Sequence, residues 1–153
     1  MKLYKLIGDE NNLFGYIKNH PITHKTDWSG TYFQNNIPHA LTCYGYRIDQ
    51  GYKLFNLIEF DVGDNIKIIE LDDAFICDPK IPGIEKANFI KSKYQIDKNV
   101  FLCDWLHQQN SILKCLEFCD VFEYFVPINT HIIHNEKIIA QYKTNNKMDL
   151  IQL

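Results

Sequence analysis

The sequence predicts an α+β domain with many strands and two helices. Strand-like segments outnumber helix-like segments, and the two kinds do not alternate along the chain as they would in a doubly wound parallel sheet. The chain has 153 residues, of which 46 % are hydrophobic and 14 % are aromatic. This length and composition allow one ordinary hydrophobic core, so we expect a single domain over residues 1–153.

The N-terminal third is expected to contain two or three strands. Residues 2–7 are mainly apolar and predict the first strand, and a short apolar run at 13–17 is a candidate for the second. Residues 18–29 include a His-Pro step and several polar residues, which are typical of a loop. The sequence "GTYF" at 30–33 then predicts a short strand.

A helix is expected to follow this strand and to end near Gly45. Asn35 or Asn36 can cap its first turn with a side-chain oxygen, and Pro38 falls where a missing backbone N–H costs little. The apolar side of this helix would carry Ala40, Leu41 and Tyr44.

Two strands are expected next, at Lys53–Phe60 and Asn65–Glu70, because both segments are dense in Leu, Ile and Phe. The residues "DVGDN" at 61–65 are typical of a turn between them. Residues 72–83 contain two prolines and a glycine and predict a long loop. The segment 86–96 is expected to return as a strand.

The last third is expected to hold a long helix and then closing strands. The helix would span 105–119, with Asp104 as its cap. Its apolar face would carry Trp105, Ile112, Leu116 and Cys119. The closing strands are expected at 121–126, 130–134 and 137–142, with "NEK" at 135–137 as the last turn.

Charge and composition exclude several classes of function. The net charge is −3 and the sequence contains one arginine, Arg47, so recognition of nucleic acid by several arginines is excluded and nucleic acid is not an expected partner. No apolar run approaches 18 residues, so no membrane association is expected. Five cysteines without an export signal favour reduced thiols and a cytoplasmic location.

The sequence contains no recognisable metal or nucleotide motif. Cys115, Cys119 and His107 are the nearest approach to a metal site, but four ligands at a recognisable spacing are missing, so buried free cysteines are expected instead. No glycine-rich phosphate loop and no nucleophile motif occurs either.

The stretch "WSGTYFQNNIPHALTCYGYR" at 28–47 has two interpretations: hydrophobic core, or the wall of a pocket for a flat ligand. Neighbouring residues of a strand face opposite ways, so Tyr32 and Phe33 cannot both be buried by the same core. Gly30 would allow another group to approach the backbone closely. A tyrosine at the edge of a cleft would meet water or ligand with its hydroxyl group. These points favour Tyr32 as the residue that lines a cleft.

The order of elements resembles the ADP-ribosyltransferase fold, a split-sheet family that includes bacterial toxins and the poly(ADP-ribose) polymerases. The resemblance rests on the first strand with Tyr4-Lys5, on "GTYF" at 30–33, on the helix "HALTCYGY" at 39–46, and on "LFNLIEFDVGDNIKIIELDD" at 54–73. The resemblance covers about residues 2–73, and a weaker similarity extends over residues 121–142.

This resemblance implies two small, mostly antiparallel half-sheets with NAD bound between them. It also implies an activity: transfer of ADP-ribose from NAD to a protein or nucleic-acid group. The binding residues that it implies are Tyr4, Lys5, Gly30, Thr31, Tyr32 and Tyr44. The catalytic residues that it implies are Lys5, Tyr32 and Glu123. Because the tyrosine of this strand faces the ligand in the family, the resemblance also implies that Phe33 is the core residue.

The chain departs from the family pattern at two places. Lys5 stands where the family has a histidine or an arginine, and Lys5 has neither a flat ring nor a two-pronged donor. The late catalytic glutamate is also displaced, because the strand that begins "NTHIIH" offers Thr130 or His131 there. Glu123 and Glu136 are the nearby carboxylates, and Glu136 falls in an expected turn.

These departures keep two other hypotheses open. The first is a non-enzymatic interaction protein of viral or phage type, suggested by a composition rich in Lys, Asn and Ile and poor in Arg and Gly. The second is a small module that binds or sequesters a nucleotide. Measuring NAD binding together with nicotinamide release would separate the three hypotheses.

Overall fold

The computed structural model describes residues 1–8, 27–42, 53–78, 80–116, 122–127, 136–145, 147 and 149–153. These residues form an α+β fold with two four-stranded sheets, which confirms the expected fold class. The chain divides into two compact units that are each assembled from separate segments. Unit 1 comprises Met1–Pro21, Phe33–Gly63 and Ile133–Leu153, and unit 2 comprises Ile22–Tyr32 and Asp64–Ile132.

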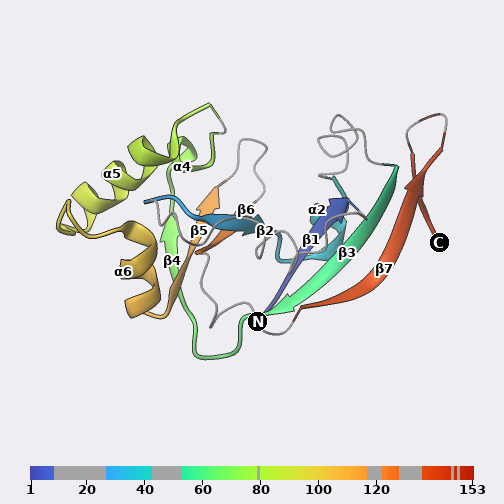
Figure 1. The fold of residues 1–153 in the computed structure, drawn as a ribbon, viewed down its shortest axis with the longest axis horizontal. Coiled ribbons are helices and arrows are strands. Elements are labelled where there is room, and N and C mark those ends of the chain that lie inside the picture. The colour runs from blue at the N-terminus through green and yellow to red at the C-terminus, as the bar shows by residue number, and fades with distance from the viewer. Residues whose placement is uncertain are drawn as a thin grey trace. The chain divides into compact units, whose positions relative to one another are not determined.

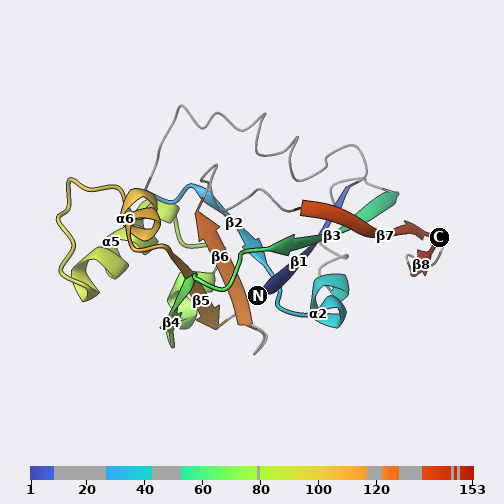
Figure 2. The same ribbon diagram turned by 90° about the horizontal axis from the view of Figure 1, so that it is seen from below.

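Unit 1 is an antiparallel sheet with one helix (Figures 1 and 2). The strands lie in the order β1-β3-β7-β8, and every pair is antiparallel. Their bounds are β1 Lys2–Gly8, β3 Leu54–Asp61, β7 Glu136–Thr144 and β8 Leu150–Gln152, and the helix is α2, Ile37–Thr42.

The helix α2 begins where the sequence predicts. The Asn36 side chain accepts a hydrogen bond from the His39 backbone N–H at 2.8 Å, which satisfies one of the free donors of the first turn. Figure 2 shows α2 on one face of the sheet. The core between them contains Leu6, Ala40, Phe55, Leu57 and Tyr142. The expected end of this helix near Gly45 lies outside the described residues.

Unit 2 is a mixed sheet packed against helices (Figure 1). The strand order is β2-β6-β5-β4, with β5 antiparallel to β6 and parallel to β4. The strands are β2 Gly30–Phe33, β6 Phe122–Pro127, β5 Ser111–Leu116 and β4 Lys67–Leu71. The helices are α4 Ala74–Cys77, α5 Gly83–Lys93 and α6 Leu102–Gln108. Its core joins α5 and α6 to the strands through Ala87, Ile90, Leu106, Leu113 and Phe125.

The prediction of a strand at 86–96 is wrong, because residues 86–93 lie in helix α5. Pro82 directly precedes the helix, and Lys91 and Lys93 occupy its last turn, where cations stabilise the helix dipole. The buried positions of α5 are 86, 87, 90 and 91, which follow the helical period. Two of these positions are lysines, so the apolar pattern of the sequence does not reveal the helix.

The long helix expected at 105–119 is also wrong. The helix α6 starts earlier, after Phe101, and ends at Gln108. Asn110 then adopts a left-handed backbone with φ of 50°, a conformation that asparagine tolerates better than most residues and that ends the helix. From Ser111 the chain forms β5, which pairs with β4 and places Ile112 and Leu113 in the core.

Most of the other expected elements agree with the structure. Strands are present at all the other expected positions that the structure describes. Two short elements were not expected, α4 inside the supposed loop 72–83 and the last strand β8. The expected strands at 13–17 and 130–134 lie outside the described residues. Among the described residues, no helix is long and apolar enough to cross a membrane.

Candidate functional site

The residues implied by the resemblance are distributed over both units. Tyr4 and Lys5 lie on β1 in unit 1. On β2, Gly30, Thr31 and Tyr32 belong to unit 2, as does Glu123 on β6. Tyr44 lies outside the described residues.

Tyr4 and Lys5 face opposite sides of the sheet in unit 1, as neighbours on a strand must. Tyr4 packs against the core beneath α2, and its backbone exchanges hydrogen bonds of 2.7 and 2.9 Å with Gln34. The Lys5 ammonium lies 5.8 Å from the centre of the Phe33 ring, within the range of a cation–π contact. These two side chains therefore do not share one face of β1.

Gly30 leaves room for a neighbouring strand. A Cβ at this position would overlap the Phe125 ring and would lie 2.5 Å from the backbone oxygen of Val126. The close approach to the backbone of Gly30 is thus made by β6. Thr31 is buried, so among the β2 residues implied as NAD ligands Tyr32 is the aromatic one and is partly exposed.

Tyr32 and Phe33 point in opposite directions, as their alternation along β2 predicts. Phe33 is 1 % exposed and stacks on Phe60 at 5.2 Å between ring centres, so its expected role as a core residue is confirmed. Tyr32 is half-buried and contacts the edge of the core of unit 2. Part of the Tyr32 residue therefore stays accessible to solvent.

Tyr32 belongs to a compact group with three other side chains, which we call the Trp28 cluster: Trp28, Tyr32, Lys86 and Phe125. Trp28 stacks on Phe125 with 4.2 Å between ring centres and 19° between ring planes. The Trp28 indole Nε1–H donates a hydrogen bond of 3.1 Å to the Tyr32 hydroxyl oxygen. The Lys86 Nζ lies 5.7 Å from the Trp28 ring and 5.9 Å from the Tyr32 ring. The cluster thus combines flat ring surfaces with one positive charge.

The first residue of α5, Gly83, packs directly against the Trp28 side chain. A Cβ at Gly83 would lie 2.6 Å from the Cβ of Trp28, so a side chain at this position would displace the tryptophan. The absence of a side chain at Gly83 lets the first turn of α5 pack directly on Trp28. This contact also brings Lys86, one turn later on the helix, to the ring faces.

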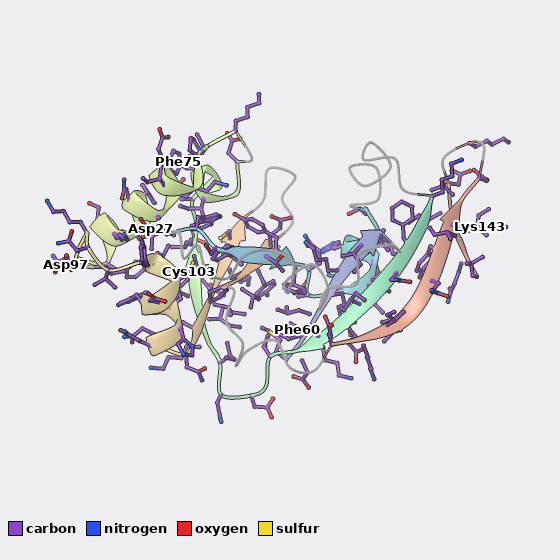
Figure 3. The ribbon with its side chains drawn as sticks, in the orientation of Figure 1. Asp27, Phe60, Phe75, Asp97, Cys103 and Lys143 are labelled. Carbon is purple, nitrogen blue, oxygen red and sulfur yellow. The ribbon has the colours of Figure 1, made fainter. Side chains whose placement is uncertain are left out.

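A polar network fixes the segment before β2. Asp27 forms an ion pair with Lys91 of α5, and the same carboxylate oxygen accepts a hydrogen bond of 3.1 Å from the Leu102 N–H at the start of α6. The Cys103 thiol accepts a hydrogen bond from the Ser29 N–H at 3.1 Å and contacts the Asp27 and Ser29 carbonyl oxygens. Figure 3 shows Asp27 close to Cys103, which lies in the first turn of α6. Two helices therefore hold the chain on both sides of Trp28.

Cys103 is a structural thiol. Its pKa is raised from the ordinary 9.0 to about 12, mainly by burial. The nearby carboxylates of Asp104 and Asp27 contribute to this rise, and the Ser29 N–H and the Lys91 charge oppose it. A thiol reacts as a nucleophile through its thiolate form. Cys103 is therefore protonated at neutral pH and acts as a hydrogen-bonding group in this network.

The raised pKa of Cys103 predicts a loss of stability in alkaline solution. In the unfolded chain the thiol releases its proton near pH 9.0, whereas the folded chain retains it up to about pH 12. Rising pH therefore favours the unfolded state over this window, by about 1.4 kcal/mol per pH unit and about 4 kcal/mol in all. Urea unfolding at a series of pH values above 9.0 should show a smaller alkaline loss in Cys103→Ala.

The matched control is Cys115→Ala, which removes another buried free cysteine from the same unit. If Cys103→Ala loses stability with rising pH as steeply as the unsubstituted chain does, the proton on Cys103 does not contribute to folding as argued.

Glu123 lies on β6, two residues before Phe125, and therefore on the same face of that strand. Its side chain is half-buried, and its backbone is in register with Cys115 on β5. Its proposed catalytic role stays a prediction. Among the described residues, no three His, Cys, Asp or Glu side chains come together as metal ligands would.

No protein-family model matches the chain, and no curated protein matches it. The function is therefore argued from the residues of the site.

Sequence reasoning missed the contribution of Lys86 and of the Asp27–Lys91 pair to this region. Both lysines lie on a segment that the apolar pattern assigns to a strand, where neither would have a reason to be buried. Asp27 falls in an expected loop, and its partners are separated from it by more than sixty positions of the sequence. One local signal was available, because Pro82-Gly83 followed by Glu85 is typical of a helix start.

Proposed function

We propose that the chain is an ADP-ribosyltransferase-like domain that binds NAD or a related nucleotide and transfers ADP-ribose to a macromolecular acceptor. The observation that carries this proposal is the position of Tyr32. Tyr32 is only half-buried on β2, while the adjacent Phe33 is buried in a core. This is the division of roles that the resemblance assigns to the "GTYF" strand.

The order of elements gives further support. The strand β1, the strand β2, the helix α2 and the strands β3 and β4 follow one another in the order on which the resemblance rests. The strands also divide into two separate sheets, as in a split-sheet architecture.

The bound NAD would supply the bond between ribose and nicotinamide that breaks in ADP-ribose transfer. Tyr32 would present its ring to a flat part of the nucleotide. Glu123 would stabilise the positive charge that develops on the ribose, because a carboxylate favours a cationic transition state.

The proposal is tested by calorimetric titration with NAD, paired with an assay for released nicotinamide. Binding with release is expected. Binding without release would favour the module that binds or sequesters a nucleotide. No binding would contradict the proposal and leave the non-enzymatic interaction protein as the remaining hypothesis.

Replacing Tyr32 with alanine is expected to weaken NAD binding by about tenfold or more, because stacking of a ring on an aromatic side chain contributes about 1–3 kcal/mol. The free energy of unfolding should change less than the affinity, since the ring is only half-buried. The measurement is calorimetric titration of the variant, with a thermal melt to verify folding. Tyr32→Phe should keep most of the affinity because it keeps the ring.

Tyr94→Ala is the matched control for this experiment. Tyr94 is also a half-exposed tyrosine of unit 2, and its ring lies 6.1 Å from that of Trp105. Its removal should leave NAD affinity unchanged. Equal weakening by both alanine variants would show that Tyr32 has no specific role in binding.

A further inference from the structure

We draw no further inference here: the strongest candidate, the surface patch on the unit 1 sheet where Leu54 of β3 and Ile151 of β8 are exposed on either side of Lys143, is an unpartnered apolar face, and nothing in the described part of the chain shows what covers it.

Discussion

Replacing Lys91 with methionine is expected to lower the free energy of unfolding by about 3–5 kcal/mol. The Lys91 side chain is 4 % exposed and its partner Asp27 is 18 % exposed, so the variant leaves a largely buried carboxylate without its counter-ion. The methionine retains most of the aliphatic volume, so the loss reports the charge. Urea unfolding followed by circular dichroism measures it.

Two companion variants separate the ion pair from other causes. Lys93→Met changes an exposed lysine two positions further along α5 and should cost about 0.5 kcal/mol or less. The double variant Asp27→Asn/Lys91→Met should lose less than the sum of the two single variants, because neither isolated charge remains buried. Additive losses, or a loss below about 1 kcal/mol for Lys91→Met, would show that the pair does not hold the segment as argued.

The elements of this chain that can be predicted from the sequence are those with a local signal. The strands β1, β3, β4 and β7 were predicted because their residues carry a local signal of dense apolar residues between turns. The start of α2 was predicted for the same reason, since a cap is a contact between residues three apart, as the hydrogen bond from His39 to Asn36 shows. Signals of this kind depend on neighbours in the sequence.

Helix α5 shows where local signals fail. Its buried stripe contains Lys86 and Lys91, which a hydrophobic pattern counts as exposed. Both are buried because distant residues provide their partners: Asp27 for Lys91, and the rings of Trp28 and Tyr32 for Lys86. The sequence does not show that these segments meet, so it also does not show that the segment is helical.

The break after α6 has a similar cause. The pattern from Trp105 to Leu116 suits a helix, but as a strand Ser111–Leu116 gains backbone partners on both sides, in β4 and in β6. Pairing with a distant strand outweighs local propensity here. The left-handed conformation of Asn110 marks the change of direction.

The candidate site was predictable in part. Alternation along a strand is a local rule, and it placed Tyr32 and Phe33 on opposite faces. The reason for Gly30 was not local, because the group that approaches it is the Phe125 ring of β6. The charge near Tyr32 comes from a helix more than fifty residues later in the sequence, so Lys86 could be found only in the folded chain.

Phe33→Ala is expected to cost about 3–5 kcal/mol of unfolding free energy, the range measured when a large core aromatic is removed. Phe33 is fully buried in unit 1, where its ring stacks on Phe60 and its other neighbours include the Lys5 ammonium. Alanine would leave a cavity beside Phe60. It would also remove the cation–π contact between the Lys5 ammonium and the Phe33 ring. Phe33→Leu should cost less, about 1–1.5 kcal/mol, because it fills more of the space.

The contrast between Phe33→Ala and Tyr32→Ala tests the interpretation of β2 as a strand with one core face and one ligand face. Urea unfolding should show the large loss in Phe33→Ala, and NAD titration should show the large loss in Tyr32→Ala. The two effects should separate, because adjacent side chains of a strand serve opposite faces. If Tyr32→Ala unfolds the protein while Phe33→Ala leaves it stable, the tyrosine is the core residue. The surface on which a nucleotide base would stack, and with it the main support for the transferase proposal, would then be lost.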